Sequence, residues 1–119
     1  MEVTVDLLFL VVLCGLTVGV RKVELAAEAH GIRTRLHVLD AVSPSNAIFA
    51  SESGSFSDDG RRLRARDVAY KYGQDLLPDW PLGYGNCEAA VVFDNKIPNN
   101  CLPILWVEKK GWKPLFRRL

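Results

Sequence analysis

Few side chains in this sequence have the types and spacing that catalysis or metal binding needs. His30 and His37 are its two histidines, and its three cysteines show no Cys-x-x-Cys or paired Cys/His spacing. GxSxG, HExxH and P-loop motifs are also missing. Because such sites need these groups at short, recognisable separations, the sequence predicts no enzyme activity, no catalytic residue, no metal site and no cofactor.

A charged and aromatic segment closes the chain, EKKGWKPLFRRL. Basic residues interleaved with aromatic ones suit the headgroup region of an anionic membrane leaflet, and equally an acidic patch on a partner subunit. A frayed terminus is the third interpretation. With the two basic residues that follow the apolar run described below, the predicted membrane-surface or partner contacts are Arg21, Lys22, Lys109, Lys110, Trp112, Lys113, Phe116, Arg117 and Arg118.

A second basic segment, GRRLRAR at residues 60–66, could contact phosphate groups of lipid or nucleic acid. It lacks interleaved aromatic residues, and the chain as a whole carries a formal net charge of only +1. A solvated helix face therefore explains these arginines better, and no nucleic-acid partner is expected.

An uncharged apolar run, residues 7–20, is the first element that could position these residues. As a helix it would extend about 21 Å, or about 27 Å when residues 3–5 are included, against a hydrocarbon core of about 30 Å. Gly15, Thr17 and Gly19 form a GxxxG pattern that allows close helix packing. The run therefore predicts a short transmembrane helix that packs against a neighbouring one.

The alternative is a soluble α/β domain in which residues 7–13 form a central strand, with a nucleotide or phosphate site or a small enzyme's active site near residues 15–19. This interpretation needs a turn at residues 15–19. That segment is as apolar as the strand before it, and it does not match GxGxxG. A cleaved signal peptide fits less well, because no basic region precedes the run.

Positive residues directly after the run predict the orientation of the span, with the N-terminus outside and the C-terminal domain on the cytoplasmic or equivalent inner side. We therefore expect a membrane and juxtamembrane helix over residues 1–30 and a small α+β domain over residues 31–119. The predicted function is an accessory or scaffolding subunit of a membrane complex. Its partners would be other membrane subunits, bound through the helix, and anionic lipid headgroups.

Within the α+β domain, alternation predicts a possible strand over residues 32–39. An N-cap serine, two aspartates and a helical stripe predict an amphipathic helix over residues 57–77. Residues 88–94 and 101–107 are predicted to form a β-hairpin around NKIPNN. That hairpin would hold Cys87 and Cys101 farther apart than the Cα separation of about 7 Å that a disulfide tolerates, which favours reduced thiols.

Overall fold

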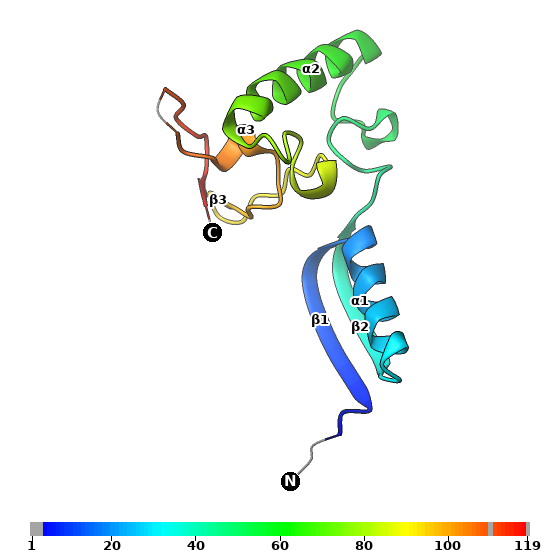
Figure 1. Cartoon of the computed structure of the whole chain (residues 1–119). Coiled ribbons are helices and arrows are strands. Elements are labelled where there is room, and N and C mark those ends of the chain that lie inside the picture. Colours follow the sequence, from blue (N-terminus) through cyan, green and yellow to red (C-terminus); the bar gives the residue numbers. More distant parts are fainter. Residues whose placement is uncertain (1–3, 110, 119) are drawn as a thin grey trace. The chain divides into compact units, whose positions relative to one another are not determined.

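The computed structural model describes residues 4–109 and 111–118, which form two compact units, Met1–Ser43 and Pro44–Leu119. Unit 1 consists of strand β1 (Leu7–Leu16), helix α1 (Thr17–Ala29) and strand β2 (Arg33–Val42) (Figure 1). The two strands pair in parallel, from Leu7 opposite Arg33 to Leu16 opposite Val42. Unit 1 is therefore a β-α-β element, the basic unit of α/β domains.

The predicted transmembrane helix is wrong, because β1 takes up most of the apolar run and α1 takes the rest. Within the described residues, no helix is long and apolar enough to cross a membrane. The run includes Val11 and Val12, and β-branched side chains favour extended backbone. Pairing with β2 provides hydrogen-bond partners for the backbone groups along one edge of the strand.

The alternative strand over residues 7–13 describes this region better, although β1 extends to Leu16. The objection to that alternative was that it needs a turn at residues 15–19, where the sequence is apolar. The structure has no turn at these residues. Leu16 is the last residue of β1, and Thr17 is the first residue of α1. A junction without a loop needs no polar loop residues.

Helix α1 covers one face of the parallel pair. A side chain at Gly15 would lie 3.1 Å from methyl groups of Val12 and Val20, and 3.7 Å from Val38. Residues of β1, α1 and β2 therefore converge at Gly15, where glycine allows the helix to approach the sheet. The helix ends at Ala29, with His30 as its C-cap, and Gly31 follows with a φ of 70°, as is typical of a C′ glycine.

Unit 2 contains one long helix, α2 (Asp59–Leu76). The sequence predicts its start at Ser57, but the N-cap is Asp58, whose carboxylate accepts the Arg61 backbone N–H at 2.8 Å. The helix ends just before Pro78, as expected from proline's restriction of the preceding residue. The other elements are short: η1 (Ser51–Ser53), η2 (Tyr84–Asn86), β3 (Lys96–Ile97), α3 (Pro103–Trp106) and β4 (Arg117–Arg118).

The predicted hairpin between residues 88–94 and 101–107 is also wrong. Phe93 and Lys96 exchange backbone hydrogen bonds of 2.7 and 2.8 Å around Asp94 and Asn95, both of which have positive φ. This is a tight two-residue turn of the kind that Asp and Asn favour. The second predicted strand instead contains α3, with Pro103 in its first turn, where a missing N–H costs nothing.

The core of unit 2 lies between α2 and the segments before and after it. Phe49, Ala69, Leu82 and Leu102 form a buried cluster, and Gly73 of α2 lies directly against the backbone of Pro81. The Arg66 guanidinium and the Glu88 carboxylate form an ion pair of 2.6 Å that joins α2 to this core. These contacts hold the backbone from which the C-terminal segment extends.

Cys87 is a free thiol in the structure, so no disulfide joins it to Cys101. The Cys87 thiol donates to the Asn100 carbonyl at 3.3 Å, and Cys101 is buried beside Val91. Burial, the largest cause, raises the pKa of the Cys87 thiol above its ordinary value. Its reactive thiolate form is therefore scarce near neutral pH.

We expect Cys87 to be alkylated by iodoacetamide more slowly than glutathione between pH 7 and 9, with equal rates once the protein is unfolded. The raised pKa of Cys87 in the folded protein also contributes to the free energy of unfolding. This contribution is fully present below the thiol's ordinary pKa of about 8.5, and it is lost as the pH rises through the pKa of the folded protein. Mass spectrometry of labelled peptides measures the rate. Labelling of Cys87 as fast as that of glutathione in the native protein would contradict the burial.

Candidate functional site

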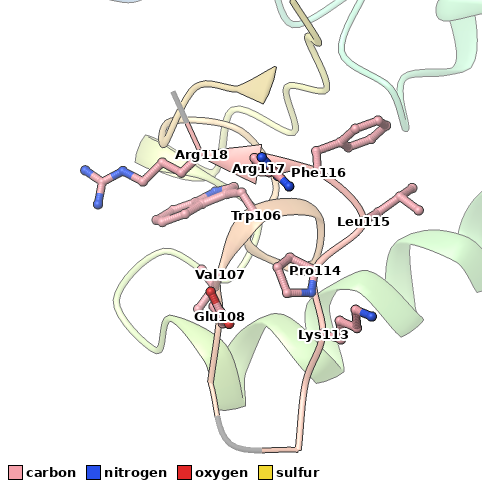
Figure 2. A pocket seen from close by; sticks show the side chains of 9 residues that line it. All are labelled: Trp106, Val107, Glu108, Lys113, Pro114, Leu115, Phe116, Arg117 and Arg118. Atoms are coloured by element: carbon pink, nitrogen blue, oxygen red, sulfur yellow. The ribbon is translucent and has the colours of Figure 1, made fainter. Parts of the chain in front are cut away.

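An open depression of about 640 Å³ lies in the C-terminal part of unit 2. The residues that line it come from the end of α3 and from the final segment of the chain. They are Trp106, Val107, Glu108, Lys113, Pro114, Leu115, Phe116, Arg117 and Arg118 (Figure 2). The depression thus contains most of the predicted basic aromatic tail.

Backbone hydrogen bonds hold this segment in place. The Phe116 N–H donates to the Leu105 carbonyl at 3.0 Å, and the Arg117 N–H donates to the Asn95 carbonyl at 3.3 Å. Strand β4 also pairs in parallel with β3, with Arg117 opposite Lys96. The arginines of the tail therefore lie on ordered backbone, which does not support the interpretation of the tail as a frayed end.

Trp106 forms one wall of the depression. Its indole Nε1 donates to the Cys101 carbonyl at 3.0 Å, which fixes the ring. The Arg118 guanidinium carbon lies 5.5 Å from the ring centroid, within the range of a cation–π contact. Figure 2 shows Arg118 above Trp106, while Leu115 and Phe116 point away from that pair. An aromatic face and a cation therefore lie together in the lining of the depression.

Positive charge dominates the lining. Lys113, Arg117 and Arg118 are exposed, and Glu108 is the one carboxylate among the lining residues. Lys96 adds a further cation, because its register opposite Arg117 places both side chains on the same side of the two-stranded sheet. Directly opposed like charges are destabilising. Within the described part of the chain, none of these four cations has a carboxylate within ion-pair distance.

The arginines of residues 60–66 differ in this respect. Arg61 pairs with Asp58 at 3.4 Å, Arg62 with Asp59 at 3.3 Å, and Arg66 with Glu88. These three cations already have anionic partners on or near α2. Three of the four arginines of residues 60–66 are thus paired, whereas the cations that line the C-terminal depression have no ion-pair partner among the described residues.

Other predicted contact residues lie outside the depression. Lys109 donates to the Asp75 carbonyl at 3.0 Å, at the end of α2, and the Trp112 indole donates to the Ile104 carbonyl at 3.1 Å. Both side chains thus hold the segment in place. Arg21 pairs with Glu24 on α1, and Lys22 is exposed on the same helix. Lys110 lies outside the described residues.

The predicted helix-packing residues do not share one helix. Gly15 lies in β1, whereas Thr17 and Gly19 lie in the first turn of α1. This turn has no side-chain cap and no acidic residue, and it follows the carboxyl end of a strand in a parallel pair. Such a position can accept an anion, although no basic side chain lies in that first turn.

Sequence reasoning did not name five of the nine lining residues, and it also missed Lys96, which pairs with Arg117 beside them. The five are Trp106, Val107, Glu108, Pro114 and Leu115. Trp106 was assigned to a strand, and Lys96 to a hairpin loop. The Asp-Asn pair before Lys96 is the one sequence signal that could have placed it, since it marks a two-residue turn. The parallel pairing of Lys96 with Arg117 joins residues far apart in the chain and has no local signal.

The sequence profile of the family PRTase-CE matches residues 3–118 of the chain. The family consists of phosphoribosyltransferase-like α/β domains. Neither the curated proteins nor the solved structures contain a match to the chain.

This match corrects several predictions. The accessory membrane subunit and the absence of enzyme activity are wrong, because the family is phosphoribosyltransferase-like. The predicted membrane partners, the lipid headgroups and the N-outside orientation all depended on a span that the described helices do not provide. The α/β phosphate-binding alternative agrees better with the family.

Proposed function

Because this chain belongs to the PRTase-CE family, we propose that it is a phosphoribosyltransferase-like enzyme domain whose C-terminal depression binds the phosphate groups of a phosphoribosyl donor. The observation that carries the proposal is a group of cations around one open depression, Lys113, Arg117 and Arg118, which have no ion-pair partner among residues 4–109 and 111–118. A diphosphate would supply the negative charge that this group lacks.

Each cation suits a different part of such a donor. Arginine guanidinium groups bind phosphate oxygens in pairs, and lysine acts as a mobile point charge. Arg118 is held over Trp106, so its side chain is partly ordered before a ligand arrives. This ordering lowers the entropy cost of binding.

Phosphoribosyl transfer breaks the bond between ribose C1 and the diphosphate oxygen and forms a bond from C1 to an acceptor. The electron pair of the broken bond leaves on the diphosphate, and the acceptor loses a proton. Cations beside the diphosphate stabilise the charge that develops there. The proposal assigns this proton to Glu108, the carboxylate among the lining residues.

Titration calorimetry with 5-phosphoribosyl 1-pyrophosphate tests the proposal. We expect Arg117→Gln to weaken binding by about tenfold or more, because a hydrogen bond to a charged group contributes about 1.5–3 kcal/mol. Lys113→Gln should have a smaller effect and should flatten the dependence on salt. The matched control is Arg61→Gln, which removes an exposed arginine that is paired with Asp58.

Two results would contradict the proposal. The first is equal affinity in Arg117→Gln and in the unchanged protein. The second is an equal loss in the Arg61→Gln control, which would show a response to net charge and not to the depression. Circular dichroism of each variant confirms that unit 2 remains folded.

A further inference from the structure

Unit 1 has a sheet face that the described residues of that unit leave bare. On β1, Leu7, Phe9 and Val11 alternate with the residues that face α1, and their exposed fractions are 45%, 59% and 64%. Val5, just before the strand, continues the row at 56%. Sheets of parallel strands in α/β proteins are normally buried on both faces. This apolar row therefore lacks the cover that its neighbours on the opposite face receive from α1.

A basic row lies beside the apolar one. The register places Arg33 opposite Leu7, Arg35 opposite Phe9 and His37 opposite Val11. The rings of Phe9 and His37, 5.2 Å apart, show that the two rows share one face. Arg33 and Arg35 are exposed, and among the described residues neither has a carboxylate within ion-pair distance.

We propose that this face binds an amphipathic helix of a partner protein, with an apolar ridge on the β1 row and acidic residues facing Arg33 and Arg35. The chemistry of the two rows defines the partner. The row from Val5 to Val11 extends about 20 Å at about 3.3 Å per residue, which about 13 helical residues would cover. A helix is the element that packs on parallel strands, and the basic row requires its flank to be acidic.

The test uses the full chain and two synthetic 15-residue helical peptides that share one leucine ridge. One peptide carries glutamate along the flank and the other carries lysine. Fluorescence anisotropy should show tighter binding of the glutamate peptide, and Val11→Asp should weaken that binding by about tenfold or more, since a buried charge is costly. Leu63→Asp, at an exposed position of α2 in unit 2, is the matched control and should bind normally.

A charge swap keeps the test independent of the folding of Val11→Asp. The variant Arg33→Glu/Arg35→Glu should prefer the lysine peptide. Equal binding of the two peptides, or failure of both to bind, would overturn the proposal. If the chain dimerises and Val11→Asp abolishes the dimer, the face binds a second copy of the chain instead of a partner helix. If hydroxyl-radical labelling finds Phe9 already protected in the free monomer, another part of this chain buries the apolar row, and the proposal fails.

Discussion

Replacing Lys96 with glutamate should stabilise the folded protein and weaken its binding of 5-phosphoribosyl 1-pyrophosphate at the same time. Lys96 lies opposite Arg117 in the parallel pair of β3 and β4, so the change converts a like-charge pair into an opposite-charge pair. Opposite charges across strands contribute about 0.2–1 kcal/mol. The same glutamate would repel a diphosphate and neutralise the arginine that we propose binds it.

The expected loss of affinity is about tenfold, since a charge reversal several ångströms from a phosphate changes the interaction by about 1–2 kcal/mol near a protein surface. Urea unfolding and calorimetry of the same preparation measure the two effects. Lys71→Glu, at an exposed position of α2, is the control for net charge. If Lys96→Glu changed stability and affinity in the same direction, the idea that Lys96 serves anion binding at a cost to stability would fail.

Replacing Gly73 with alanine should destabilise unit 2 more than any single change on its surface. A Cβ at this position would lie 2.0 Å from the Pro81 carbonyl oxygen and 2.8 Å from its carbon. Both atoms belong to backbone, so the clash cannot be relieved by rotating a side chain. Overpacking of this kind typically costs about 1–3 kcal/mol, and a rigid contact lies at the upper end or beyond.

Gln74→Ala is the matched control, because this neighbouring side chain is exposed on the same helix and alanine favours helix formation. Its free energy of unfolding should stay within about 0.5 kcal/mol of the unchanged protein. Urea denaturation followed by far-UV circular dichroism compares the two variants. Equal stability of Gly73→Ala and Gln74→Ala would show that α2 does not lie against Pro81 as described.

Part of the candidate site could be predicted from sequence. Basic residues interleaved with aromatic ones marked the final segment as a binding surface, and Lys113, Phe116, Arg117 and Arg118 do line the depression. Local composition was sufficient for this, because charge and aromatic content do not depend on the fold. The nature of the partner was wrong, because the same residues suit any anionic surface.

The fold depended on a choice that local pattern does not decide. Residues 7–20 are apolar throughout, and an uninterrupted apolar run suits a buried strand as well as a membrane helix. The decisive fact is that Arg33–Val42 lies parallel to Leu7–Leu16 and pairs with the backbone groups along one edge of that strand. That partner begins 26 positions later in the chain, beyond the reach of any local pattern.

By itself, the sequence determined which residues carry charge at the C-terminus, where α2 ends, and that no familiar catalytic motif is present. Helix boundaries follow from caps and prolines, whose effects are local. Only the tertiary structure decided that Lys96 lies beside Arg117 and that Trp106 holds Arg118. These contacts join segments that lie apart in the chain, so their energies depend on the packing of unit 2 and not on the neighbours of each residue.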